Sequence, residues 1–149
     1  GREEGILVGI SSGAAAFAAA ELAKLAFIVN VVINDDKPAL RLIDGKWYAY
    51  GTPWCGKDGI NQNRKAPVAG ICFMKQGKEN SIRRLSAEEA LQSLMPQTIY
   101  KFTKVDRLDL MLNLVENLIS NVPIYELENI PVPEAALLSY RTMSGVENE

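Results

Sequence analysis

The chain has 149 residues, 48% of them hydrophobic and 23% charged, so it is the size of one domain and can form a buried core. Its formal net charge of −2 argues against a protein that binds nucleic acid through overall positive charge. It contains no histidine and therefore lacks the commonest general base and the commonest metal ligand of proteins.

Cysteine content and hydropathy predict a cytosolic protein without a membrane span. Cys55 and Cys72 form neither a CxxC pair nor a metal-site spacing, and so few thiols in a chain of this length indicate a reducing compartment. The apolar residues 6–33 are interrupted by polar and charged residues, which a spanning helix tolerates poorly. We therefore expect a buried strand–helix–strand unit there and no membrane contact.

The first predicted elements are a strand, a turn and a helix. Residues 6–10 are apolar and predict a buried strand, and Ser11, Ser12 and Gly13 form the turn after it. Either serine can cap the alanine-rich helix that follows. Residues 27–33 are rich in β-branched side chains and predict a second strand, parallel to the first through a right-handed crossover.

The middle of the chain predicts further strands around a polar loop. Residues 39–43 and 47–50 flank an Asp-Gly dipeptide, which favours a two-residue hairpin turn. A loop rich in glycine, asparagine and charged residues follows over residues 51–65. Residues 68–76 predict a central strand, and the alternation of residues 81–85 predicts a half-exposed one.

The last third of the chain predicts helices. The segment SAEE that begins at Ser86 is a capping box, and Pro96 is expected to end the helix it starts. Residues 105–121 carry apolar side chains at helical spacing. A short strand over residues 124–127 and a helix over residues 134–143 complete the prediction.

The middle of the chain contains the stretch INDDKPALRLIDGKWYAYGTPWCGKDGINQNRKAPVAGICFMKQGKENSIRRLSAEEAL. This stretch resembles small bacterial proteins of the HPr-kinase-like group, which share a fold with the ATP-dependent phosphoenolpyruvate carboxykinases. The resemblance covers residues 33–143. It implies a single α/β domain with one mixed sheet and the P-loop, carboxykinase-like fold. It also implies that Asp35 and Asp36 match the acidic pair that would serve Mg²⁺ beside ATP.

The segment that takes the place of the P-loop resembles a different family. The P-loop motif needs glycines, a lysine and a hydroxyl residue around the phosphates, and this chain has no such motif. Instead, REEGILVGISSGAAAFAAAELAK, within residues 2–25, resembles cysteine synthase and related fold-type II pyridoxal-phosphate enzymes. In that family the first serine of GISSGA, which matches Ser11, bonds the pyridine nitrogen of the cofactor.

These two resemblances lead us to interpret the chain as a recombined or engineered chimera; the alternative is a divergent natural protein. The single domain of residues 1–149 would then contain a transplanted strand–helix element at residues 2–25 and a kinase-like body at residues 33–143. Residues 144–149 are expected to form a frayed tail.

The sequence offers three groups of candidate site residues. The turn of Ser11, Ser12 and Gly13, at the helix N-terminus of residues 9–14, is a candidate site for phosphate or sulfate. The aspartates at positions 35 and 36 are candidate magnesium ligands through the family resemblance. The loop cations Lys57 and Arg64, with Lys65 beside them, either face the same cleft as nucleotide-binding residues or are ordinary surface charge.

Three functions remain open at this point. The first is a non-catalytic chimeric scaffold with at most a weak anion site, without cofactor or nucleic-acid partner. The second is an ATP- and magnesium-binding, HPr-kinase-like protein with an altered P-loop. The third is a binding or self-assembly module, a homo-oligomer, that uses the aromatic cluster of Trp47, Tyr48, Tyr50 and Trp54. Pyridoxal phosphate is not expected, because the family's Schiff-base lysine lies in a segment that this chain lacks, and Lys24 lies too far along the helix to replace it.

Overall fold

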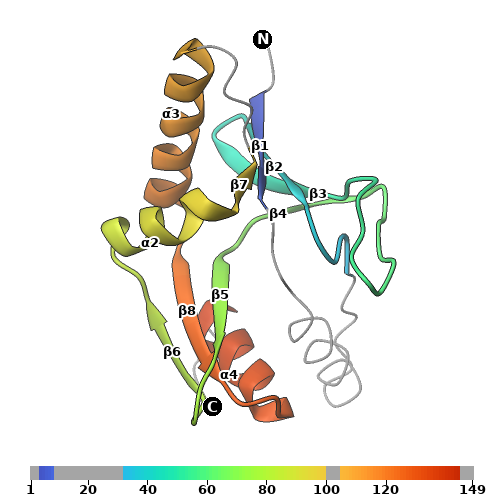
Figure 1. Cartoon of the computed structure of the whole chain (residues 1–149), viewed down its shortest axis with the longest axis vertical. Coiled ribbons are helices and arrows are strands. Elements are labelled where there is room, and N and C mark those ends of the chain that lie inside the picture. The colour runs from blue at the N-terminus through green and yellow to red at the C-terminus, as the bar shows by residue number, and fades with distance from the viewer. Residues whose placement is uncertain (1–3, 9–31, 100–104, 145–149) are drawn as a thin grey trace.

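Two β-sheets and three α-helices form the part of the chain that the computed structural model describes, residues 4–8, 32–99 and 105–144 (Figure 1). The strands are β1 (Glu4–Val8), β2 (Ala39–Ile43), β3 (Lys46–Tyr50), β4 (Lys65–Pro67), β5 (Ile71–Gln76), β6 (Ser81–Arg84), β7 (Thr98–Ile99) and β8 (Ile124–Asn129). The helices are α2 (Ala87–Leu94), α3 (Val105–Asn121) and α4 (Pro133–Ser144), with a 3₁₀ turn, η1 (Met95–Gln97), after α2.

The larger sheet is antiparallel and has the strand order β4-β3-β2-β1-β7. Its centre is the predicted hairpin of β2 and β3. Asp44 and Gly45 both have positive φ, 48° and 77°, as the two central residues of a type I′ turn require. The local signal in the sequence therefore specified this hairpin correctly.

The smaller sheet has the order β5-β8-β6, with β5 parallel and β6 antiparallel to β8. The expectation of one mixed sheet is wrong, because the strands divide between two sheets. The expected central strand, observed as β5, lies at an edge. Its apolar residues Ile71 and Phe73 pack against the core, and this contact accounts for the hydrophobic sequence of a strand that has a neighbour on one side only.

Several predictions fall on parts of the chain outside the described residues. These are the turn at Ser11, Ser12 and Gly13, the alanine-rich helix, residues 27–31 of the second strand and the tail from residue 145. Within the described residues, β1 is antiparallel to both of its partners, β2 and β7. The parallel crossover between the first two predicted strands therefore stays a prediction.

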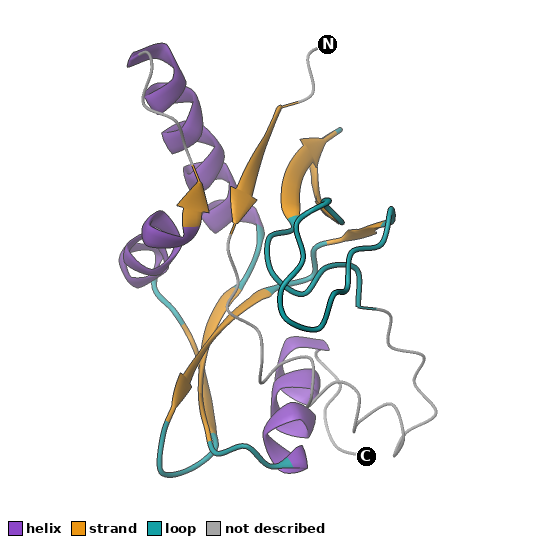
Figure 2. Cartoon of the chain, turned by 45° about the vertical axis from the view of Figure 1, so that its right-hand side comes forward, coloured by secondary structure: helices purple, strands orange, loops and turns teal. Residues whose placement is uncertain are grey.

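One hydrophobic core connects the two sheets with α2 and α3. Figure 2 shows the strands and helices from a second direction. The buried members of the core are Leu40, Trp47, Leu85, Ala90, Leu94, Met111, Leu114, Val115, Leu118, Val122 and Ile124. Trp47 of β3 is only 3% exposed, and its indole Nε1–H donates to Asn117 Oδ1 of α3 at 3.0 Å. Burial of the ring and pairing of its N–H together attach the larger sheet to α3. The described residues are thus one α/β domain.

The helical predictions in the last third of the chain are confirmed. Ser86 caps α2: its hydroxyl oxygen accepts from the Glu89 N–H at 3.3 Å, and the Glu89 carboxylate accepts from the Ser86 N–H at 2.9 Å. Pro96 lies in η1, directly after α2 ends. The predicted stripe of α3 faces the core through residues such as Val115 and Leu118. No helix among the described residues is long and apolar enough to cross a bilayer.

The two tryptophans allow a matched test of this core. We expect Trp47→Ala to lower the free energy of unfolding by about 3–5 kcal/mol, because it leaves a cavity and an unpaired Asn117 amide oxygen. Trp54→Ala is the control: Trp54 is 57% exposed, so the change should stay within about 0.5 kcal/mol. Urea unfolding followed by circular dichroism measures both. Equal losses in the two variants would contradict the packing described for Trp47.

Candidate functional site

The loop of residues 51–64 is folded around the side chain of Asp35, a residue that is only 8% exposed. Asp35 Oδ1 accepts from the Gly56 N–H at 2.7 Å, and Oδ2 accepts from the Asp58 N–H at 3.1 Å. The backbone N–H of Asp35 in turn donates to the Ile60 carbonyl at 3.2 Å. The carboxylate is therefore directed at the loop backbone and fixes its conformation.

Asn34 fixes the first part of the same loop through its side-chain amide. Its Oδ1 accepts from the Lys37 N–H at 2.6 Å and the Asp36 N–H at 3.0 Å, which forms an Asx turn. Its Nδ2 donates to the Trp54 carbonyl at 2.7 Å, on the opposite side of the amide. The Thr52 hydroxyl adds a donor to the Lys37 carbonyl at 2.7 Å. Asn34 thus connects the end of its own turn to the loop 20 residues later.

The start and the end of the loop approach each other closely at Gly51. Its N–H donates to the Arg64 carbonyl at 3.0 Å, and a Cβ at this position would overlap the backbone carbonyl of Gln62. The Gln62 N–H also donates to the Ile33 carbonyl at 2.8 Å. Glycine is therefore required at position 51, where the start and the end of the loop meet.

The hydrogen bonds to Asp35 set its charge state. The N–H of Gly56 lowers the pKa of the Asp35 carboxyl below its ordinary value of 3.8, although burial opposes the shift. The Asp35 carboxylate is therefore ionised near neutral pH. It is a buried anion that backbone donors stabilise.

The two predicted magnesium ligands do different things in the structure. Asp36 is half-buried and its carboxylate pairs with the neighbouring Lys37 Nζ at 3.2 Å, whereas Asp35 bonds the loop. Nowhere in the described part of the chain do three acidic or cysteine side chains gather as a metal site would require. Magnesium binding by this pair stays a prediction.

The predicted loop cations also separate. Lys57 and Arg64 are exposed, and neither forms an ion pair with a described residue. Lys65 begins β4, and its Nζ lies 5.1 Å from the centroid of the Tyr48 ring and 5.8 Å from that of Tyr50. Lys65 thus belongs to the face of the hairpin.

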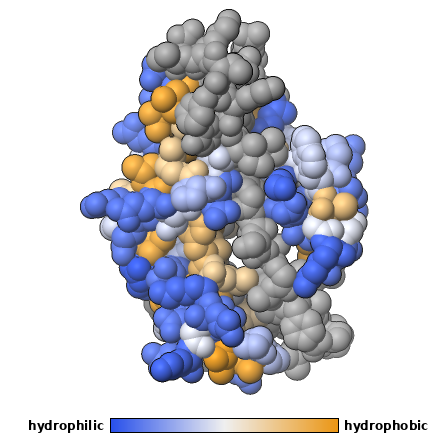
Figure 3. Space-filling model, viewed as in Figure 1, coloured by the Kyte–Doolittle hydropathy of each residue, from blue (hydrophilic) through white to orange (hydrophobic). Residues whose placement is uncertain are grey.

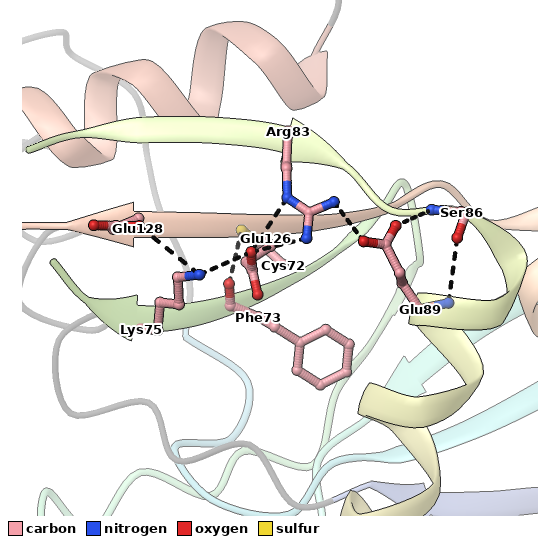
Figure 4. A network of polar contacts seen from close by, with 8 residues as sticks. All are labelled: Cys72, Phe73, Lys75, Arg83, Ser86, Glu89, Glu126 and Glu128. Atoms are coloured by element: carbon pink, nitrogen blue, oxygen red, sulfur yellow. Dashed lines mark hydrogen bonds and ion pairs between the residues drawn. The ribbon is translucent and has the colours of Figure 1, made fainter.

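A second polar cluster, which the sequence reasoning missed, crosses the smaller sheet (Figure 4). Glu126 on β8 accepts from Lys75 on β5 and from Arg83 on β6, each at 3.1 Å. Arg83 Nη1 also reaches Glu89 on α2 at 2.7 Å. Only the pairing of β5, β8 and β6 brings these charges together, so the sequence carried no local signal for the cluster.

The charges in this cluster shift the pKa values of its carboxyls. The N–H of Ser86 and then the Arg83 guanidinium lower the pKa of Glu89 to about 2. Hydrogen bonds from Lys75 and then Arg83 lower the pKa of Glu126 as well. Because the Lys75 and Arg83 side chains are each 53% exposed, solvent screens the ion pairs and their effect on stability is modest. The cluster stabilises the local arrangement of the sheet.

The cysteines are both free thiols. Burial raises the pKa of the Cys72 thiol to about 11, so this group is protonated at neutral pH. Cys72 therefore fills space in β5 and lacks the thiolate that a catalytic nucleophile needs. Cys55, in the loop of residues 51–64, is exposed.

Comparisons with known proteins identify no relative: no family model, no curated protein and no solved structure gives a significant match to this chain. The two family resemblances of the sequence, and the chimeric origin inferred from them, therefore stay hypotheses. So does the anion site at Ser11, Ser12 and Gly13, which lies outside the described residues.

The hydrogen bonds of Asp35 predict that Asp35→Asn releases the loop. The new amide places a donor against one of two backbone donors, so the amide protons of Gly56 and Asp58 should exchange with solvent faster. Asp36→Asn is the control, since the Asp36 carboxylate pairs with Lys37 and, among the described residues, accepts no hydrogen bond from the loop backbone. Hydrogen exchange followed by mass spectrometry measures both variants. Unchanged protection in Asp35→Asn would contradict the role assigned to this carboxylate.

The low pKa of Glu89 predicts a stability that depends on pH. A carboxyl whose pKa falls from 4.5 unfolded to about 2 folded stabilises the protein fully above pH 4.5, and this contribution is lost as the pH falls toward 2. Glu89→Gln should therefore lower the urea midpoint at pH 7, and the difference from the wild type should shrink as the pH approaches 2. A difference that does not change over this range would show that the charge of Glu89 is irrelevant.

Proposed function

We propose that this chain is a non-catalytic α/β domain, a recombined or engineered chimera, with at most a weak anion site at residues 9–14. The observation that carries the proposal is the position of the Asp35 carboxylate. The two oxygens that were the strongest candidate for holding magnesium bond the backbone N–H groups of Gly56 and Asp58. Asp35 thus has a structural role in shaping the loop.

The weak affinity for anions that a helix N-terminus provides without a lysine supports the same proposal. Transfer of a phosphoryl group depends on positioning and on charge compensation, yet the first lysine after the turn of residues 9–14 is Lys24. A helix N-terminus alone stabilises an anion by about 0.3–1 kcal/mol, and by about 2 kcal/mol when partly buried. Micromolar affinity needs about 8 kcal/mol. Such a turn is suited to a phosphate or sulfate ion and too weak for ATP.

The second candidate function is binding of ATP with magnesium through other residues. The observation that favours it is the exposure of Lys57 and Arg64, together with the partial exposure of Asp36; none of the three contributes to the core. Asp36 would contact the metal, and the two loop cations would contact phosphates. Pyridoxal phosphate is not part of either proposal.

Self-association is the remaining candidate. Apolar residues reach the surface along the side of the molecule that carries α2 and α3 (Figure 3). Leu91, Leu110 and Leu112 are exposed there, and Trp54 is exposed on the loop of residues 51–64. Size-exclusion chromatography over a range of concentrations distinguishes a monomer from a homo-oligomer.

Thermal shift with ATP and magnesium separates the first two candidates. We expect no change in Tm, whereas ATP at 100-fold above its Kd would stabilise the protein by about 2.7 kcal/mol. Should a shift occur, Asp36→Ala and the double variant Lys57→Ala, Arg64→Ala are the informative changes, because neither disturbs the bonds of Asp35 to the loop. A shift that these variants abolish would overturn the non-catalytic proposal in favour of nucleotide binding.

A further inference from the structure

The outer face of β2, β3 and β4 carries cations and aromatic rings side by side. Antiparallel pairing places Arg41 opposite Tyr48, and Tyr50 opposite Lys65. Residues that alternate with them, such as Leu40 and Trp47, are buried in the core on the other face. The cationic–aromatic face is defined by Arg41, Lys46, Tyr48, Tyr50 and Lys65.

Contacts between cations and rings order this face. Lys65 Nζ lies over both tyrosine rings, 5.1 Å from the Tyr48 centroid and 5.8 Å from the Tyr50 centroid. Arg41 Cζ lies 5.3 Å from the Tyr50 centroid. A ring attracts a cation without cancelling its charge, as a carboxylate would. The positive charge of Lys65 is therefore positioned and still able to attract an anion.

No carboxylate of the described residues compensates the lysine charges on this face. β2, β3 and β4 contain one arginine and two lysines but no aspartate or glutamate. No carboxylate of the described residues lies within ion-pair distance of Lys46 or Lys65, and both side chains are exposed. The nearest acidic residue in sequence is Asp44 in the hairpin turn. A chain with a net charge of −2 thus presents a positive face.

We propose that the cationic–aromatic face binds single-stranded nucleic acid. Proteins that bind single strands combine positive charge along the backbone of the nucleic acid with aromatic side chains that contact its bases. The distance from Tyr50 to Lys46 along β3, about 13 Å at 3.3 Å per residue, gives room for more than one nucleotide. The proposal is independent of the function proposed above, and the overall negative charge does not oppose a local site of this kind.

The rings distinguish a single strand from other anionic partners. In a duplex the bases are paired and stacked inside, so Tyr48 and Tyr50 would have no base to contact. An acidic protein segment would pair with the cations but would leave the rings without a role.

Fluorescence anisotropy with labelled oligo(dT) and oligo(U) of about 12 nucleotides tests the proposal, at several salt concentrations. We expect saturable binding that weakens with salt. Lys65→Ala should reduce the slope of log K against log salt by about 0.7, the value for one phosphate contact on a single strand. Lys78→Ala is the matched control: Lys78 is also exposed but lies in the turn between β5 and β6, and its loss should change nothing.

The tyrosines are tested separately. Tyr48→Leu should weaken binding about fivefold or more with little change in the salt slope, whereas Tyr48→Phe keeps the ring and should bind as the wild type does. Circular dichroism verifies that each variant is folded. The proposal is overturned by absence of binding at low salt, by equal binding of a duplex, by a polyglutamate peptide that binds as tightly as the oligonucleotides, or by equal effects of Lys65→Ala and Lys78→Ala.

Discussion

Burial of Trp47 between the larger sheet and α3 is the contact on which the arrangement of the described elements depends. A large aromatic ring removes more apolar surface from water than any other side chain, but its N–H must find an acceptor when buried. Asn117 supplies that acceptor from α3, 70 residues later in the chain. The hairpin of β2 and β3 is thereby attached to α3, whose buried residues share the core with Ile124 of β8. The core is consequently shared by both sheets, although the sheets themselves have no strand in common.

The need of polar groups for hydrogen-bond partners also explains the conformation of the loop of residues 51–64. A loop rich in glycine and asparagine has many backbone groups that need partners, and Asn34 and Asp35 supply them from one short turn. The rigid loop that results leaves Trp54, Lys57 and Arg64 exposed at its surface. Two adjacent aspartates thus have different partners: Asp35 bonds the loop backbone, whereas Asp36 pairs with the neighbouring Lys37.

Charge is distributed unevenly over the two sheets. On the smaller sheet, Lys75 and Arg83 pair with glutamates across neighbouring elements, so these charges compensate one another. The larger sheet places Lys65 over two tyrosine rings, which orient the ammonium group but leave its positive charge in place. Because of this contrast, we expect an anionic partner at the outer face of the larger sheet and not at the smaller sheet.

The sequence by itself determined the features that depend on a few neighbouring residues. The turn at Asp44 and Gly45, the capping box from Ser86 to Glu89 and the apolar stripe of α3 were all predictable, because each is specified by bonds or spacing within two turns of chain. The family resemblances suggested a role for Asp35 in metal binding but did not indicate its bonds to the loop. Only the tertiary structure decided that bonding, the division of the strands into two sheets and the edge position of β5. The physical reason is distance along the chain. The hydropathy pattern of a strand shows which of its faces is buried, but it does not show which strand will pair with it. The hydrogen-bond partners of buried polar side chains are likewise undetermined locally, because they lie 20 to 70 positions away in the sequence.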